Sequence, residues 1–118
     1  MEDNEIIEKQ KIICSKYGFS FELSTFDSKV AIALNVKDSK LPIHALRHPT
    51  TKNLSGWYIW SGEYSEEDNF FKPLHISHLK EWCPDILPYL GLPAGSRFLI
   101  AENGNYVDVW EDITLFDV

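Results

Sequence analysis

The densest group of side chains that could do chemistry lies between Gly62 and Phe71, where the sequence reads GEYSEEDNFF. Carboxylates interspersed with aromatic rings are typical of protein interfaces, because buried rings supply affinity while the charges attract a basic partner. The alternative is a solvated acidic loop whose rings turn inward to the core. We predict an interface, and its candidate partner-binding residues are Glu63, Tyr64, Glu66, Glu67, Asp68 and Phe70.

The same carboxylates could instead bind calcium or transfer protons. A calcium loop has oxygen ligands at alternate positions, a central glycine and a distal glutamate, and this segment lacks that order. General acid–base catalysis needs two carboxyl groups at a set separation and with different pKa values, and neighbouring positions in a sequence establish neither. The sequence therefore favours adhesion and leaves catalysis by carboxylates open.

The four histidines form two further groups that could bind a metal or activate a nucleophile. His75 and His78 precede Cys83, but a zinc site needs three or four ligands and no second cluster follows. His44 and His48 have neither a nucleophile elbow nor a Cys-His signature beside them, and the chain has no glycine-rich phosphate loop. We predict no catalytic residue, no cofactor and no metal. The alternative is a small hydrolase or ligand-binding enzyme that uses His75, His78 and nearby carboxylates.

Charge is unevenly distributed along the chain, which has a net charge of −7. Residues 1–59 contain seven acidic and eight basic side chains, whereas residues 60–118 contain eleven acidic and three basic ones. Nucleic-acid binding needs a positive face that replaces the counterions of the phosphates, so we predict no nucleic-acid partner. Such a negative field favours a basic protein partner, although many acidic proteins carry it only for solubility.

Length and composition predict one domain that spans residues 1–118, with 44% hydrophobic residues to form its core. No run of about 18 apolar residues could span a membrane, and the first residues are charged where a secretory signal would be apolar. We therefore expect a cytoplasmic protein with no membrane partner. In that compartment Cys14 and Cys83 are expected to be buried thiols and not a disulfide. The sequence does not indicate the oligomeric state.

Hydrophobic periodicity predicts the elements that would position these side chains. Apolar residues recur at helical spacing over residues 3–17, and a glycine follows where that helix would end. Two-residue alternation predicts strands over residues 19–23 and 30–36, and Pro42 restricts a third strand to an edge or to its first position. The aromatic and β-branched run of residues 57–60 lies between two glycines and predicts a central strand.

The second half of the chain predicts short helices followed by a hairpin. Ser77 and Pro84 are suited to begin two such helices. Two strand-like runs, residues 97–101 and 106–110, flank an Asn-Gly pair that favours a hairpin turn. This order of elements predicts an α+β fold with a mainly antiparallel sheet, an N-terminal helix, and short helices before a C-terminal hairpin. The predicted core includes three tryptophans in these strands: Trp57, Trp60 and Trp110.

Four stretches of the second half are distinctive: SGWYIWSGE, FFKPLHISHL, CPDILPYLGLPAGSRFLIA and YVDVW. Together they resemble the bacterial toxin-immunity proteins of immunity family thirty-three and their relatives, over about residues 53–112. The shared pattern is a Ser-Gly-Trp strand followed by Ser-Gly-Glu, and then a Leu-Gly-Leu-Pro turn before the last hairpin. The resemblance implies a small intracellular protein that binds and neutralises a toxin and has no catalysis of its own. It assigns no toxin-contacting residue in this chain.

The first functional hypothesis is therefore an immunity protein that occludes a cognate toxin stoichiometrically, at a basic surface of that toxin. An interface of about 1,600 Å² in total would be sufficient, and a domain of this size can supply it. A regulatory adaptor protein and the small hydrolase described above are the alternatives. A toxin domain encoded beside this chain would favour immunity over both. The sequence names neither the toxin nor its activity.

Overall fold

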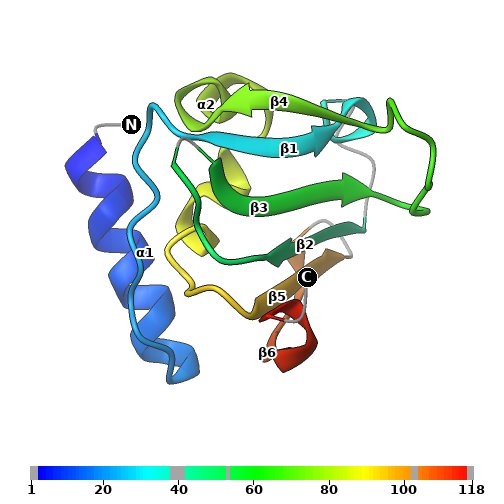
Figure 1. The fold of residues 1–118 in the computed structure, drawn as a ribbon. Helices are drawn as coiled ribbons and strands as arrows, with labels where there is room; N and C mark the ends of the chain where they lie inside the picture. The colour runs from blue at the N-terminus through cyan, green and yellow to red at the C-terminus, as the bar shows by residue number, and fades with distance from the viewer. Residues whose placement is uncertain (1–2, 38–41, 53, 102–103, 117–118) are drawn as a thin grey trace.

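The computed structural model describes residues 3–37, 42–52, 54–101 and 104–116 of the chain (Figure 1). It has the predicted α+β fold, with an N-terminal helix, short helices and a C-terminal hairpin. None of the described helices is both long and apolar enough to cross a membrane. The helices and strands are α1 Asp3–Tyr17, β1 Lys29–Ala33, β2 Ile43–Arg47, β3 Leu54–Ser61, β4 Phe71–His75, α2 Leu79–Trp82, β5 Ser96–Ala101 and β6 Tyr106–Glu111.

The six strands form one sheet in the order β4-β1-β3-β2-β5-β6 (Figure 1). Strands β1 and β3 are parallel, and the other neighbouring pairs are antiparallel, as predicted for a mainly antiparallel sheet. The aromatic strand β3 lies inside the sheet between β1 and β2, which confirms its prediction as a central strand. Strand β2 is also internal, and the chain enters it directly after Pro42.

Alternate residues of each strand face two different environments. One face, here called the core face, packs against α1 and the 3-10 helix Pro84–Tyr89. Its side chains include Trp57 and Ile59 of β3 and Phe98 of β5, each no more than 1% exposed. The opposite face, here called the open face, carries Tyr58 of β3 and the other residues of alternate register. Strand β3 therefore contributes side chains both to the core and to the exposed surface described below.

A buried arginine joins the sheet to the loops beside it. Arg47 is fully buried at the end of β2, and its guanidinium donates to the backbone carbonyls of Ser55, Glu22 and Leu92 at 2.8 to 3.0 Å. The Glu22 carboxylate lies 3.3 Å from the guanidinium. Burial lowers the pKa of Arg47, and the charge of Glu22 opposes that shift. Such a charge is tolerated inside a protein only when its donors are satisfied, and here they are.

Gly56 marks an irregularity in β3. Its φ is +95°, and a Cβ atom at this position would lie 2.0 Å from the carbonyl oxygen of His48. Only glycine combines a left-handed conformation with so close an approach of two backbones. The pairing of β1 with β3 shifts register near this point, between Lys29 and Ala31. The β-bulge changes the direction of the first residues of β3, which line a pocket on the open face.

Three predicted elements differ from the structure. The strand predicted over residues 30–36 ends at Ala33, and Leu34–Val36 form a 3-10 helix. Residues 19–23 do not form a strand; the segment runs beside the turn at Gly91, and the Glu22 N–H donates to the Gly91 carbonyl. Alternation thus arose from an extended segment that packs on a turn, outside the sheet. Ser77 does not cap a helix. It lies within a 3-10 turn, and its N–H donates to the Phe26 carbonyl, while α2 begins at Leu79.

The tryptophan predictions are confirmed at two positions of three. Trp57 is 1% exposed and Trp60 is 7% exposed. Trp110 is 38% exposed, so the expectation that it is buried was wrong. The reason is the register of the edge strand β6, in which Val107 and Val109 pack toward the core and Trp110 takes the open face. Of the two aromatic residues next to each other in β3, Trp57 packs in the core whereas Tyr58 is 38% exposed.

Candidate functional site

Aromatic rings form a continuous row across the open face, from the end of β2 to the loop between β3 and β4. Neighbouring rings meet edge to face, with centroids 5.3 to 6.2 Å apart, which is the geometry that aromatic quadrupoles favour. We call these residues the aromatic row. In order of contact they are His48, Tyr58, Phe71, Trp60, Tyr64 and Phe70.

The predicted partner-binding residues lie at one end of this row. Residues 63–70, here called the acidic segment, connect β3 to β4 and extend beyond the ends of these strands (Figure 1). The Phe70 N–H donates to the Glu67 carbonyl at 3.0 Å, and the Glu67 N–H donates to the Ser65 hydroxyl at 3.2 Å. All four carboxylates of the segment are exposed, and within the described residues none takes part in an ion pair: Glu63, Glu66, Glu67 and Asp68.

The two predicted rings of the acidic segment join the row and are not buried in the core. Tyr64 is 57% exposed and packs on Trp60, while Phe70 is half-buried between Tyr64 and Phe71. The structure therefore brings together all six predicted residues on one loop, with its rings against the sheet and its carboxylates in water. Their role in binding a partner stays a prediction.

Two histidines of β2 and its C-terminal end belong to the same face. His44 stacks on Trp60 with a centroid distance of 5.3 Å and an interplanar angle of 16°. Burial, and to a smaller extent the charge of Arg97, lower the pKa of His44 below its ordinary value of 6.5. His48 hydrogen-bonds through Nδ1 to the Leu115 carbonyl at 3.0 Å, which makes Nδ1 the donor. Neither arrangement places a nucleophile beside an imidazole.

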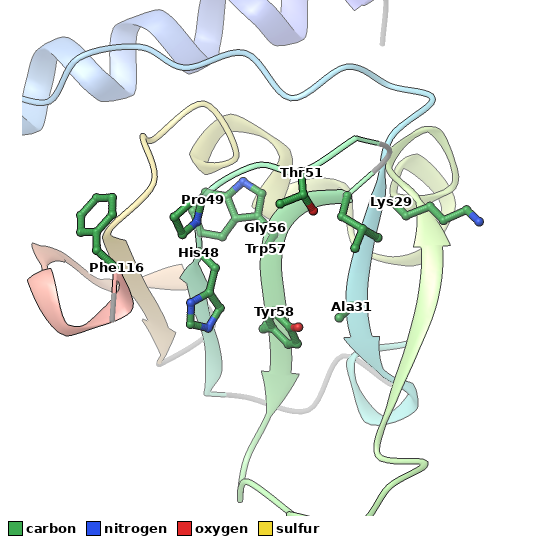
Figure 2. A pocket seen from close by; sticks show the side chains of 10 residues that line it. Lys29, Ala31, His48, Pro49, Thr51, Gly56, Trp57, Tyr58 and Phe116 are labelled. Carbon is green, nitrogen blue, oxygen red and sulfur yellow. The ribbon is translucent and has the colours of Figure 1, made fainter. Parts of the chain in front are cut away.

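A pocket of about 440 Å³ lies at the other end of the aromatic row, over the first residues of β3. Figure 2 shows Tyr58 in its middle, with His48, which follows β2, to one side and Ala31 of β1 to the other. Phe116, from the C-terminal 3-10 helix Ile113–Phe116, and Lys29 stand at opposite sides (Figure 2). The remaining lining residues are Pro49, Thr51, Leu54, Gly56 and Trp57.

His75 and His78, the basis of the enzyme alternative, lie apart from the acidic segment. Both are exposed at the far end of β4, with ring centroids 5.8 Å apart. In the part of the chain that the structure describes, no group of three or more His, Cys, Asp or Glu side chains is placed to hold a metal ion. Cys83, the third residue of the sequence pattern, is buried, and burial raises the pKa of its thiol.

The family model of the Imm33-like domain matches residues 9–112, which is most of the chain. The chain belongs to the Imm33-like family. This confirms the resemblance carried by the motifs of the second half, and it extends the match to the first strands and to the part of α1 from residue 9 onward. No curated protein and no solved structure matches the chain.

The Imm33-like match includes both ends of the aromatic row but stops short of the C-terminal 3-10 helix, which begins at Ile113. Phe116, which lines the pocket, therefore lies outside the matched residues. The acidic segment and Tyr58 lie within them. Membership of an immunity-protein family points to a toxin as the partner in general and does not identify the contacting residues.

Sequence reasoning missed the pocket and the open-face side chains of β2. The available signal was the alternation of β2, which puts His44, Leu46 and His48 on one face opposite Ala45 and Arg47. Alternation separates two faces but does not say which one is covered. Because β3 is aromatic on both faces, its pattern favoured a strand buried on each side.

Proposed function

We propose that this Imm33-like protein is an immunity protein that neutralises a cognate bacterial toxin by binding and occluding it in a stoichiometric complex. The family match supports a toxin as the partner. The proposal adds that the toxin presents a basic surface and that the acidic segment contacts it. No catalytic step is required, since occlusion alone removes the toxin's active surface from its substrate.

The observation that carries the proposal is the placement of the acidic segment on the aromatic row. Four exposed carboxylates lie within six residues, and the rings of Tyr64 and Phe70 pack beneath them on Trp60 and Phe71. A loop held on packed rings is more ordered than a free loop, so less conformational entropy is lost when it binds. This arrangement supports a preformed contact surface over a solvated loop.

The two kinds of side chain would act on different steps of binding. Exposed carboxylates at the rim steer a basic partner and raise the association rate, and added salt screens that effect. Rings that become fully buried in the complex hold the partner and set the dissociation rate. Substitutions of the carboxylates should therefore change the association rate, whereas substitutions of the rings should change the dissociation rate.

The first test is protection. A toxin domain found encoded beside this chain is expressed in a sensitive bacterium with and without the protein, and the purified pair is analysed by light scattering. We expect growth to be rescued and a complex of fixed stoichiometry to form. Failure of rescue together with no complex would refute the proposed function.

The second test addresses the acidic segment. Replacing Glu63, Glu66, Glu67 and Asp68 by Gln or Asn should lower the association rate constant about tenfold or more at low ionic strength, with a smaller effect at high salt. A control variant carries the same four-charge change on exposed residues of the helical layer: Glu5, Glu8, Glu81 and Asp85. Equal slowing by both variants would mean that only net charge matters and that the acidic segment is not the contact.

The enzyme alternative has its own measurement. Elemental analysis of the purified protein should find no stoichiometric zinc, and replacing His75 and His78 by Ala should leave protection unchanged. Stoichiometric zinc that is lost in this double variant would favour the hydrolase hypothesis.

A further inference from the structure

The pocket beside Tyr58 is not used by the function proposed above. It lies on the same open face as the acidic segment, but at the opposite end of β3, because Leu54 and Gly56 begin that strand and Glu63 follows its end. At about 3.3 Å per residue the two ends are about 20 Å apart. A single partner that covers the open face would therefore touch both.

The lining of the pocket indicates what it would take. Rings contribute much of the wall, from His48, Tyr58 and Phe116, and Leu54 and Ala31 add aliphatic surface. Pockets that hold small ligands are about 300 to 1,000 Å³, so this one has room for a large side chain. Another aromatic ring would meet these walls edge to face, in the geometry that the row already uses.

Charge at the pocket differs from charge at the other end of the face. Lys29 stands at the side of the pocket, and within the described residues it makes no ion pair. Its ammonium group disfavours a second cation in the pocket, whereas the acidic segment favours one. The two ends of the open face thus differ in charge as well as in shape. This difference fixes the orientation in which a partner binds.

The exposed aromatic side chains point to the same surface. The exposed aromatic residues of the described chain all belong to the open face or to the segments at its ends: Tyr58, Tyr64, Tyr106, Trp110 and Phe116. Six strands about 4.8 Å apart and about 17 Å long give a plane on the order of 400 Å². This plane is about half of the roughly 800 Å² per partner of a standard interface, and the acidic segment and the C-terminal 3-10 helix extend it at its ends.

We propose that the pocket beside Tyr58 binds one aromatic side chain of the toxin, while the acidic segment at the opposite end of the open face binds a basic group of the same toxin. This rests on the proposed function, because it names the toxin as the occupant. The pocket supplies the anchor that resists dissociation, and the acidic segment supplies the attraction that speeds association. Two separate contacts about 20 Å apart set a single docked orientation.

The experiment has an arm that needs no toxin. The ¹⁵N-labelled protein is titrated with 4-methylphenol, the side-chain analogue of tyrosine, and amide shifts are followed by NMR. We expect saturable shifts at Ala31, Tyr58 and their neighbours in the millimolar range, as the small number of ligand atoms allows. Shifts scattered over the surface, or centred elsewhere, would overturn the pocket as an aromatic site.

The second arm uses variants and the catalytically inactivated toxin domain encoded beside the chain. Ala31→Phe places a ring inside the pocket on a strand that accepts aromatic residues. It should abolish the 4-methylphenol shifts and raise the toxin dissociation rate at least tenfold, with the salt dependence of association unchanged. Ser15→Phe adds the same ring to an exposed position of α1 and should behave as wild type.

A second variant covers the case in which Ala31→Phe fails to fold, as judged by circular dichroism. Leu54→Ser removes an exposed part of the pocket wall and should raise the dissociation rate several-fold. Dissociation as slow as wild type in a folded pocket variant overturns this inference while the proposed function stands.

The remaining outcomes separate the two proposals. Absence of toxin binding by the wild-type protein overturns both, whatever the 4-methylphenol titration shows. Light scattering should find the free protein monomeric. A dimer that Ala31→Phe dissociates would make a second copy of this chain the occupant, which also overturns the inference.

Discussion

Side chains of the same kinds have different exposure and different contacts on the two faces of the β-sheet. On the core face Trp57 is 1% exposed, and its indole N–H donates to the Leu90 carbonyl at 3.1 Å. On the open face the next residue, Tyr58, is 38% exposed and meets the rings of His48 and Phe71 in T-shaped contacts. One strand therefore provides a structural anchor and a candidate contact surface at alternate positions. Aromatic content by itself does not distinguish a structural anchor from a contact surface.

Charged groups follow the same division. The guanidinium of Arg47 is buried on the core face, where carbonyls and one carboxylate satisfy it. The carboxylates of the acidic segment lie in water without a partner among the described residues. A satisfied buried charge stabilises a fold only as part of its network, whereas solvated charges are available to another molecule. Substitutions on the two faces should accordingly affect different measurements.

The largest expected effect is on stability. Trp57→Ala should lower the free energy of unfolding by about 3 to 5 kcal/mol, because it leaves a cavity and removes one of the donors to the Leu90 carbonyl. Tyr58→Ala, one residue along, should cost about 1 kcal/mol, as is usual for a partly exposed side chain. Urea denaturation measures both. Equal losses would show that the open face is as much a part of the core as the other face.

Arg47→Met should lower the free energy of unfolding by about 3 kcal/mol, because it deprives several buried carbonyls of their donor. Glu22→Gln should cost less than about 1 kcal/mol, since the carboxylate is partly exposed and screened by solvent. Thermal unfolding of both variants tests the difference. A stable Arg47→Met variant would mean that these carbonyls find water instead.

Phe70→Ala should affect binding more than folding. The toxin dissociation rate is expected to rise about tenfold, equivalent to about 1.4 kcal/mol, because the ring would be buried in the complex. The free energy of unfolding should change by less than about 1 kcal/mol. Tyr17→Ala on α1 removes a half-exposed ring elsewhere and serves as the control for surface-plasmon kinetics. Wild-type dissociation of Phe70→Ala would assign this ring to loop structure alone.

The smallest effect concerns pH. Stacking on Trp60 buries His44, and that burial lowers the pKa of His44 in the folded protein below 6.5. The unfolded chain therefore takes up the proton first, so the stabilisation is complete above pH 6.5 and is lost as pH falls through the lowered folded value. His44→Gln should remove this part of the pH dependence of the free energy of unfolding, measured by urea denaturation at several pH values. If the free energies of unfolding of wild type and His44→Gln changed with pH in parallel, this contribution of His44 would be contradicted.

Much of the fold could be predicted from local pattern. The spacing of apolar residues defined α1, and the aromatic run of β3 and the Asn-Gly hairpin signal located three strands. Local pattern failed where an extended segment packs on a turn, as at residues 19–23, and at Trp110, whose edge-strand register leaves the ring on the open face. These outcomes depend on which elements meet in space.

The candidate site could be predicted only in part. The acidic segment is continuous in sequence, so its six residues could be named together. The pocket is assembled from β1, β2, β3 and the C-terminal 3-10 helix, and its residues run from Lys29 to Phe116. Pairing of distant strands creates that proximity, and no local motif encodes it. Trp57 was predicted to lie in the core, but the exposure of its neighbour Tyr58 depends on which face of the sheet is covered.

Hydroxyl-radical footprinting of the toxin complex tests the central claim, that the open face is the surface that binds the toxin. Oxidation of Tyr58, Tyr64 and Trp110, exposed on or beside that face, is followed by mass spectrometry with and without the inactivated toxin domain. We expect Tyr58 and Tyr64 to be protected in the complex, while Tyr17 and Ile12 of α1 keep the reactivity of the free protein. Protection of Tyr17 and Ile12, with Tyr58 and Tyr64 still fully reactive, would place the toxin on the helical side and contradict the account.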